Sequence, residues 1–269
     1  RSANATDHRI KWTSSNKTAA TVDENGTVTA LRPIETVTIT AVYKTNPALT
    51  CSWNLKITRT KGYITKQMLD NLDLTAIKKV MITAHPDDET LWGGGHLIEG
   101  EYLVVCMTHG WNPKRRTAFE QTMRTTNDKY LILDYPDVRK TFSNGKYETD
   151  MLSTCKNAMQ EDINLILSYK KWDLIATHNP FGEYGKYLHK TISQMVTQCY
   201  NKMTNKSATL YYFGRYYNSS NKIPGEQIAP ELLAIKNSMV DRYYPTAKGA
   251  IVAFGHMIPY ENWLLPSEW

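Results

Sequence analysis

The sequence predicts an α/β protein with a mostly parallel sheet and helices on both faces, preceded by a small all-β module. Residues 9–59 alternate between apolar and polar side chains with the period of β-strands. Residues 60–269 instead alternate short apolar strands with helical patterns, as expected for a parallel sheet covered on both faces. No apolar run approaches the roughly 20 residues that cross a bilayer. We therefore divide the chain into residues 1–60 and 61–269.

The β module is predicted from short runs that are rich in Thr and Val. Asn25-Gly26 is a strong turn signal between two of these runs, because both residue types tolerate the positive φ angles of a tight hairpin. The predicted strands are residues 10–14, 21–22, 27–30, 36–43 and 52–57. This spacing is typical of a small β-sandwich.

The larger segment is predicted to place its polar site residues at one edge of the sheet. Its predicted strands are residues 80–83, 102–108, 131–133, 172–177 and 209–213. Its predicted helices are residues 89–99, 114–129, 150–169, 187–202 and 230–243. Binding and catalytic residues of parallel sheets lie at the carboxyl ends of the strands. The polar residues that follow each strand are therefore the candidates for a site.

The net charge of +6 is unevenly distributed along the chain. Residues 1–60 hold eight Lys/Arg and four Asp/Glu, and the remainder holds 24 against 22. The larger segment is thus nearly neutral and has no Lys/Arg block, which argues against nucleic-acid binding. The chain starts with Arg1 and no apolar signal segment follows, so we expect a mature or trimmed fragment that has lost any signal peptide.

The four cysteines do not indicate a structural zinc site, because they show no Cys-x-x-Cys spacing. Cys106 lies in an apolar run and is expected in the core. Cys155 and Cys199 fall in two predicted helices and could pair in an oxidising compartment. The sequence leaves that pairing open.

The first candidate site follows the first apolar strand of the larger segment. His85 and Asp88 lie on the turn before the next helix, where an imidazole and a carboxylate can both reach a zinc ion at about 2 Å. Pro86 stiffens the turn by fixing its own φ. Asp87 lies between the two ligands and could accept a proton from a water. The alternative is that Asp88 and Glu89 only cap the helix, where its dipole favours negative charge.

The second candidate site follows the strand of residues 172–177. His178 ends this strand, a loop containing glycine follows, and His189 lies in the first turn of the next helix. Because the carboxyl ends of parallel strands share one edge, we expect His189 to join His85 and Asp88 as a third zinc ligand. Three protein ligands leave a position for water, as a catalytic zinc site requires. A structural role for His189 is the alternative.

The first segment resembles the bacterial Ig-like repeat of group two. The resemblance rests on Trp12-Thr-Ser-Ser-Asn16 and on residues 20–23, 25–30 and 37–41, which occur in the right order. The strands that open such a module are missing, so we expect the fragment to begin inside it. The resemblance implies an extracellular spacer or adhesion unit, and therefore a secreted or cell-surface bacterial protein.

The larger segment resembles the PIG-L / LmbE-like de-N-acetylase family over residues of about 75–269. The resemblance rests on His85-Pro-Asp-Asp-Glu89 after a strand and on Gly182-Glu-Tyr-Gly185 leading to His189. It implies a Rossmann-like fold and a zinc-dependent hydrolase that removes N-acetyl groups, mostly from glucosamine-containing substrates. Another divalent ion such as Fe²⁺ would suit the same ligands.

The resemblance also implies roles for individual residues. The matches to the family's zinc ligands are His85, Asp88 and His189. Asp87 matches its general base, and Tyr184 matches a tyrosine that helps to polarise the acyl oxygen. Lys186 stands where the family has a histidine that stabilises the transition state. Lysine can still supply positive charge to an oxyanion, but it is a weaker proton donor at neutral pH unless desolvated.

Several further residues are expected to contact the sugar. Asp137 resembles an acidic substrate contact. Arg115, Arg116 and Glu120 resemble an Arg/Glu patch of the family, although their spacing does not align cleanly with it, and Arg116 is the member expected to contact the sugar. The other candidates are His109, Trp111, His178 and Glu183, which follow strands or lie in the second motif. Each of these could instead support the loops around the site.

The expected reaction is hydrolysis of the acetamide of an N-acetylglucosamine-containing glycan or glycoconjugate, giving acetate and a free amino sugar. Two alternatives stay open. One is a non-catalytic carbohydrate-binding or adhesion protein that keeps the fold, and the other is an amidase acting on a non-sugar acyl amide. The sequence does not specify the sugar, its linkage, the native metal or the oligomeric state.

Overall fold

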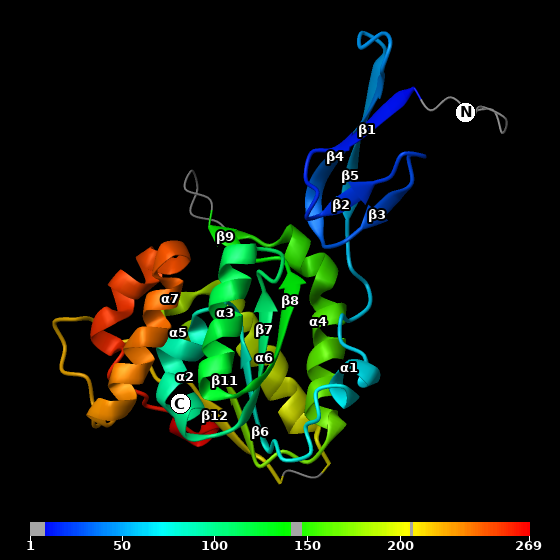
Figure 1. Ribbon diagram of the computed structural model, residues 1–269. Coiled ribbons are helices and arrows are strands. Elements are labelled where there is room, and N and C mark those ends of the chain that lie inside the picture. The colour runs from blue at the N-terminus through cyan, green and yellow to red at the C-terminus, as the bar shows by residue number, and fades with distance from the viewer. Residues whose placement is uncertain (1–8, 141–146, 205–206) are drawn as a thin grey trace.

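The computed structural model describes residues 9–140, 147–204 and 207–269. A small β module is followed by an α/β domain with a five-stranded parallel sheet (Figure 1). The predicted fold class is therefore confirmed, including the parallel sheet with helices on both faces.

The β module pairs its strands in two small antiparallel sheets. The first sheet has the order β1-β4-β5 and contains β1 (Ile10–Ser14), β4 (Ile34–Tyr43) and β5 (Thr50–Ile57). The second pairs β2 (Ala20–Val22) with β3 (Val28–Ala30) around the predicted turn. Gly26 has a φ of +84° there and lies against the indole of Trp12, so a side chain at this position would be strained and would clash.

The sheet of the α/β domain has the strand order β12-β11-β6-β7-β8, and all pairs are parallel. Its strands are β6 (Lys79–Thr83), β7 (Tyr102–Thr108), β8 (Lys129–Tyr135), β11 (Leu174–Thr177) and β12 (Thr209–Tyr212). The chain builds outward from β6 to β8 and then returns to add β11 and β12 on the other side of β6. The order reverses between β6 and β11, and the crevice at such a switch point is where ligands bind in open α/β sheets.

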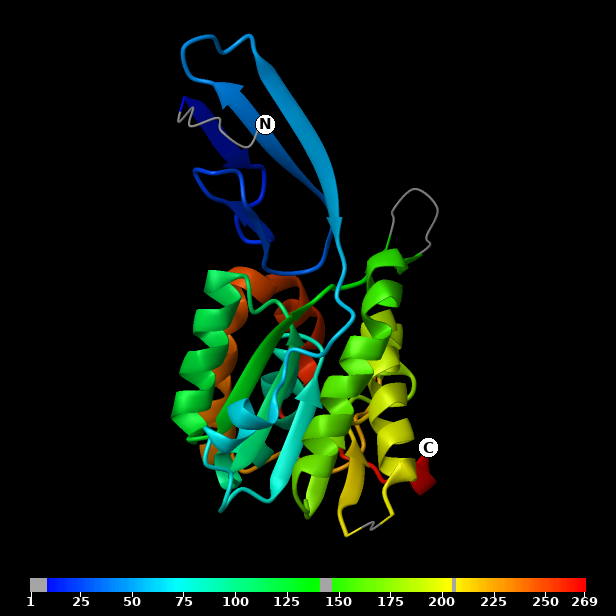
Figure 2. The same cartoon turned by 90° about the vertical axis from the view of Figure 1, so that its right-hand side faces the viewer.

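Helices cover the two faces of this sheet (Figure 2). One face packs against α1 (Lys66–Asp70), α4 (Asp150–Tyr169) and α6 (Tyr187–Lys202). The other packs against α2 (Asp88–Glu99), α3 (Pro113–Thr126) and α7 (Pro230–Phe254). The short elements are β9 (Arg139–Lys140), β10 (Tyr147–Glu148), α5 (Gly182–Gly185), η1 (Gly255–Met257) and η2 (Pro266–Glu268).

Two apolar cores explain why the central strands are apolar at every position. In β6, Val80 and Ile82 point into the core under α4 and α6, whereas Met81 points into the core under α2 and α7. Side chains alternate between the two faces along a strand, so both sets must be apolar when both faces are covered. Burying each such side chain stabilises the fold by about 1.5–3 kcal/mol.

Several predicted boundaries differ by one or two residues, and two predicted helix ends were wrong by three residues or more. The structure ends α3 at Thr126, because Asn127 takes the left-handed conformation with φ 58°, and β8 already begins at Lys129. The predicted helix instead ran through Lys129. At the other end, α7 continues past Pro245, with a kink at Ala247, where the prediction ended the helix at residue 243.

The physical reason for the long α7 is tertiary packing. Ile251 and Phe254 lie beyond the proline and are buried against the α2 and α3 side of the sheet. Proline inside a helix costs roughly 3 kcal/mol, which is comparable to the stabilisation gained by burying two such side chains.

All four cysteines are free, so Cys155 and Cys199 do not pair in this structure. No helix among the described residues is long and apolar enough to cross a membrane.

A buried ion pair ties α7 to the C-terminal segment. Lys236 Nζ lies 2.6 Å from Glu261 Oε1 and donates to the Leu91 carbonyl at 3.1 Å. Glu261 also accepts hydrogen bonds from the backbone N–H groups of Gly95 and His96. The two charged groups of this contact are therefore partnered, and the carboxylate stays buried if the lysine is removed.

We expect Lys236→Met to lower the free energy of unfolding by about 3–5 kcal/mol, because it leaves Glu261 buried without its countercharge. Urea denaturation followed by circular dichroism measures this. The matched control is Lys66→Met, which removes an exposed pair with Asp70 and should leave the midpoint near that of the wild type. Equal midpoints for the two variants would show that the buried pair contributes nothing.

Candidate metal centre

The first candidate segment lies at the strand-order reversal of the sheet. His85 lies two residues after the end of β6, and Asp88 is the first residue of α2. Asp87 between them has a φ of 142°, which a residue with a side chain rarely adopts and which costs about 1–3 kcal/mol. The Asp87 N–H donates to Glu89 Oε2 at 3.1 Å, and Glu89 in turn accepts from the Tyr243 hydroxyl at 2.6 Å. The turn is thus held in a strained shape by the helix α7 behind it.

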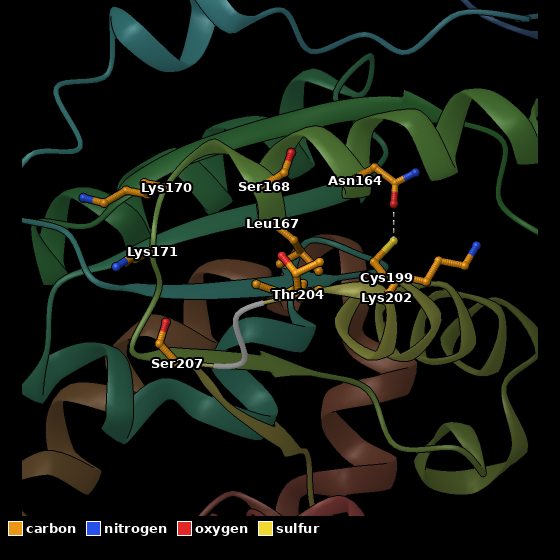
Figure 3. Close-up of a pocket in the computed structure, with 10 residues that line it drawn as sticks. Asn164, Leu167, Ser168, Lys170, Lys171, Cys199, Lys202, Thr204 and Ser207 are labelled. Carbon is orange, nitrogen blue, oxygen red and sulfur yellow. Dashed lines mark hydrogen bonds between the residues drawn. The ribbon is translucent and has the colours of Figure 1, made fainter.

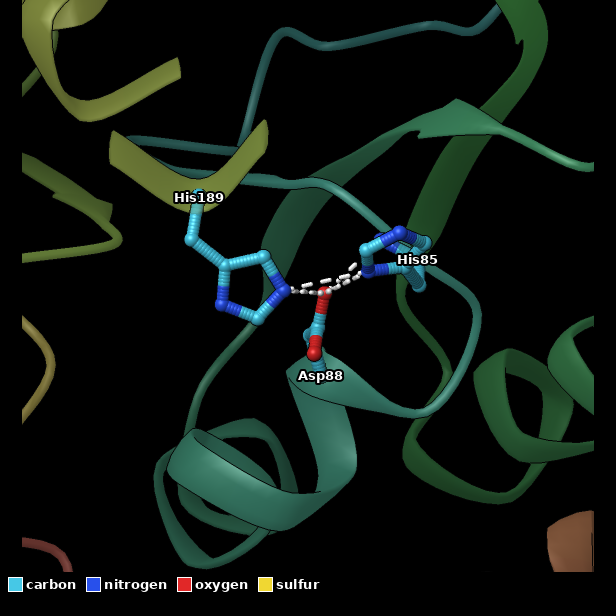
Figure 4. Close-up of side chains that lie close together, drawn as sticks. All are labelled: His85, Asp88 and His189. Carbon is cyan, nitrogen blue, oxygen red and sulfur yellow. Dashed lines mark hydrogen bonds and ion pairs between the residues drawn. The ribbon is translucent and has the colours of Figure 1, made fainter. Parts of the chain in front are cut away.

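The structure brings His85, Asp88 and His189 together from three different elements (Figure 4). His85 Nδ1 lies 3.1 Å from His189 Nε2 and 3.2 Å from Asp88 Oδ2. His189 Nε2 lies 3.4 Å from the same carboxylate oxygen. All three side chains are buried. His189 reaches the cluster from the first turn of α6, as the sequence predicted.

Two other carboxylates determine which ring nitrogens face the cluster. Asp137 Oδ1 lies 2.9 Å from His85 Nε2, and Glu183 Oε2 lies 2.5 Å from His189 Nδ1. A carboxylate accepts a hydrogen bond from the nitrogen that it contacts, so each imidazole can turn its other nitrogen inward as a lone pair. Two ring nitrogens and a carboxylate oxygen therefore face one another at about hydrogen-bond distance. Together these three atoms form a set of ligand atoms that could bind a cation.

The cluster also has the dimensions that a metal requires. A tetrahedral ion with ligands about 2.0–2.2 Å away holds them about 3.3–3.6 Å apart. The observed separations of 3.1, 3.2 and 3.4 Å are close to that range. Two histidines and one carboxylate suit zinc, and they leave a coordination position free. The residues present therefore fit the expected ion.

The electrostatics of the cluster favour added positive charge. Burial lowers the pKa of His85, but Asp137 and Asp88 outweigh burial and raise that pKa to about 10. Burial raises the pKa of Asp88, but His189 and His178 hold it well below its usual range. Burial lowers the pKa of His189, which keeps that imidazole neutral. The negative charge that favours a proton on His85 also favours a metal cation, which would take the place of that proton, and His189 is already neutral.

His178 and Glu183 lie behind the ligands and do not line the cavity. His178 Nε2 accepts a hydrogen bond from the Ala84 N–H at 2.9 Å, and its Nδ1 contacts Glu183 Oε2 at 3.1 Å. Its ring stacks on that of His189 with centroids 3.9 Å apart. Burial raises the pKa of Glu183, but the two histidines lower it to about 2. Both nitrogens of His178 are occupied, so His178, Glu183 and His189 form a weaker ligand set than the first.

A cavity of about 380 Å³ opens onto His85 and Asp88, two of the three candidate ligands. Asp87 lines it, with the guanidinium of Arg115 3.4 Å from its carboxylate. Burial and the neighbouring Asp88 raise the pKa of Asp87 to about 8, against the opposing charge of Arg115. The sequence-predicted residues that also line the cavity are His109, Trp111, Asp137, Tyr184 and Lys186.

The Arg/Glu patch is placed differently from the prediction. Arg116 does not line the cavity: its Nε donates to the Gly110 carbonyl, and the guanidinium lies 3.8 Å from Glu120. Arg115 is the arginine that reaches the site. The sequence singled out the pair but gave no signal that separates them, because the choice depends on the helical phase of α3.

His109 borders the same cavity from the loop after β7. Its φ is 66°, and its Nδ1 lies 2.7 Å from the Thr108 hydroxyl. Burial lowers its pKa to about 3, helped by the charge of His85, so the imidazole is neutral. A neutral, partly exposed imidazole beside Trp111 suits hydrogen bonding to a polar neutral ligand.

A separate cavity of about 600 Å³ lies near the amino-terminal edge of the sheet, between α4 and α6 (Figure 3). Asn164 and Cys199 line it, with the thiol 2.7 Å from the amide oxygen. None of the predicted site residues borders this cavity. Its size therefore does not make it the functional site, since the ligand cluster lies at the other end of the strands.

The fold and the cluster together define an α/β protein with a candidate metal centre at its switch point, carried behind a small β module. Residues 1–52 match the model of the bacterial Ig-like domain (group 2), which confirms the resemblance of the first segment. The chain is 31% identical over 175 residues to the uncharacterized protein L374 of Acanthamoeba polyphaga mimivirus, across 59% of this chain and 67% of that protein, and it belongs to the same family as L374.

Two solved structures are similar to the chain in part. The conserved protein TT1542 from Thermus thermophilus is 12% identical, with a TM-score of 0.45, covering 71% of this chain and 95% of that one. A termite-gut GH10 xylanase that contains a bacterial Ig-like domain is 14% identical, with a TM-score of 0.18, covering 92% of this chain and 64% of that one.

Proposed function

We propose that the chain is a divalent-metal-dependent hydrolase, with zinc as the expected ion, that removes the acetyl group from an N-acetylated amino sugar. The observation that carries this proposal is the meeting of two imidazoles and a carboxylate in one buried cluster, with His85, Asp88 and the buried acid Asp87 bordering the adjacent cavity. The resemblance of both motifs to the PIG-L / LmbE-like de-N-acetylases supports the same activity. The Ig-like module supports an extracellular substrate.

His85, Asp88 and His189 would hold the ion. When bound, zinc acidifies a water and polarises the acyl oxygen of the substrate. Asp137 and Glu183 keep the two imidazoles in the tautomer that binding needs. Fe²⁺ remains an alternative for the same ligands.

Asp87 is the proposed general base. Its carboxylate takes a proton from the attacking water and then passes a proton to the nitrogen that leaves, so a C–O bond forms as the C–N bond breaks. A group that both accepts and donates a proton works best with a pKa near the working pH, and Asp87 meets this condition because of its burial. Arg115 holds the carboxylate on the side of the cavity.

Tyr184 and Lys186 are the proposed donors to the developing oxyanion. Both line the cavity, and the Tyr184 ring packs edge-on to His189 with centroids 5.8 Å apart. Lys186 Nζ lies 3.9 Å from Asp137 Oδ2, so its charge is drawn toward the ligand cluster. Fixed donors of this kind stabilise a tetrahedral transition state by several kcal/mol.

We expect the wild-type protein to bind about one zinc ion per chain. His189→Ala should bind zinc more than about 100-fold more weakly, because removing only a residue that hydrogen-bonds to a ligand already lowers metal affinity by about 10–100-fold. Elemental analysis and competition with a chelating dye measure this. The matched control is His96→Ala, which removes a histidine that stacks on Trp263 away from the cluster. Equal zinc affinity in both variants would exclude His189 as a ligand.

Glu183→Gln should lower zinc affinity by about 10–100-fold, because an amide can present its NH₂ group to His189 and release the imidazole from its tautomer. The same titration measures it, with Glu161→Gln on the outer surface of α4 as the control. The result that contradicts the supporting role is unchanged affinity in Glu183→Gln with His189→Ala still impaired.

Asp87→Asn should lower kcat for acetate release by about 100–10,000-fold while zinc stays bound, since the asparagine cannot accept the proton. Acetate is measured from N-acetylglucosamine and chitooligosaccharides on samples of known zinc content. Asp173→Asn, an exposed change at the amino-terminal edge, is the control. Full activity in Asp87→Asn would refute the assignment of the base, and zinc binding without acetate release by the wild type would favour a non-sugar amidase.

A further inference from the structure

A second cavity, of about 680 Å³, adjoins the metal centre and is walled on one side by the Ig-like module. The module contributes Asn16, Arg32 and Glu35, and the α/β domain contributes Asp150 from the start of α4. Both cavities are bordered by His109, Trp111 and Asp137. The two cavities therefore adjoin along these three side chains, and together they are called the groove.

Specific contacts hold the module beside this groove. The Arg32 guanidinium lies 4.3 Å above the ring of Trp111, across the boundary between the two domains. The linker after β5 is fastened by Asp162 of α4, which accepts from the N–H groups of Tyr63 at 2.9 Å and Ile64 at 2.8 Å. Figure 2 shows the module standing over the carboxyl ends of the strands. It is placed where a substrate leaving the metal site would pass.

The cavity beside the module mixes polar and apolar lining, and its charges favour a particular ligand. Three carboxylates border this cavity, those of Glu35, Asp137 and Asp150, together with the guanidinium of Arg32. Glu35 is already paired with Lys56 at 2.8 Å. No carboxylate of the described residues lies within ion-pair distance of that guanidinium, and its Nε has no hydrogen-bond acceptor among them. An acidic chain would be repelled, whereas a neutral or amine-bearing chain of hydroxyl groups would find both donors and acceptors.

The size of the groove exceeds what the acetyl-bearing sugar needs. The cavity at the ligands measures about 380 Å³, and the adjoining one adds about 680 Å³. A space of about 300–1,000 Å³ holds a ligand of several rings. We propose that the groove binds the sugars that flank the one being deacetylated, so the substrate is a neutral or partly deacetylated oligosaccharide chain and the Ig-like module is part of its binding site. This inference rests on the proposed function for the identity of the reacting sugar.

The kinetic test compares kcat/KM for chitotetraose with that for N-acetylglucosamine in the full chain. We expect the wild type to prefer the tetramer, and Arg32→Ala to reduce the tetramer-to-monomer ratio at least about tenfold, as loss of a charged hydrogen-bond donor implies. Asp150→Asn, on the α/β side of the groove and away from the module contact, should also change the ratio. The control Lys11→Ala removes an exposed charge from β1 of the same module and should keep the wild-type ratio. Equal ratios in all four proteins would overturn the proposal.

A binding test separates this proposal from the proposed function. Calorimetry with zinc-loaded Asp87→Asn should show tighter binding of chitotetraose than of N-acetylglucosamine, and the weakest binding for tetragalacturonate. If chain-length-dependent binding persists but the wild type releases no acetate, the groove stands and the deacetylase fails. If acetate is released equally well from monomer and tetramer, with equal binding of both, the deacetylase stands and the extended groove fails.

Discussion

The candidate metal centre depends on which ring nitrogens of two histidines carry their protons. Asp137 accepts the outward N–H of His85, and Glu183 accepts that of His189, so both histidines face Asp88 with lone pairs. If either carboxylate were absent, its imidazole could turn an N–H inward toward a neighbouring nitrogen, and the cluster would hold a cation more weakly. The two carboxylates come from different parts of the chain, the loop after β8 and the short helix α5. Their position is therefore a property of the assembled fold.

The rest of the fold stabilises the energetically unfavourable conformations at this site. Buried carboxylates and backbone conformations with a positive φ at residues other than glycine are both unfavourable. Asp87, His109 and Glu183 combine a positive φ with a place beside the cluster. The surrounding apolar cores on both faces of the sheet hold the strand ends rigidly enough to keep these conformations. The unfavourable backbone conformations lie near the switch point of the sheet. The strands diverge there, and the backbone can leave room for a ligand.

The Ig-like module adds a second level of organisation. A spacer would need only a flexible linker, but this linker donates two backbone hydrogen bonds to Asp162, and Arg32 lies over Trp111 at the rim of the site. The module therefore borders a cavity that adjoins the one at the candidate metal centre. The anchored linker and the stacked guanidinium are the contacts that fix its place beside the α/β domain.

The sequence by itself determined the two-part organisation, the parallel sheet and the meeting of His85, Asp88 and His189, because local periodicity and the common edge of parallel strands follow from short-range patterns. It did not determine that α7 passes Pro245, since burial of Ile251 and Phe254 is a tertiary effect. Nor could it choose Arg115 over Arg116, or show that Glu183 supports His189 from behind and not from within the cavity. Those outcomes depend on helix phase and on distances between segments far apart in the chain, and only the packed structure sets such distances.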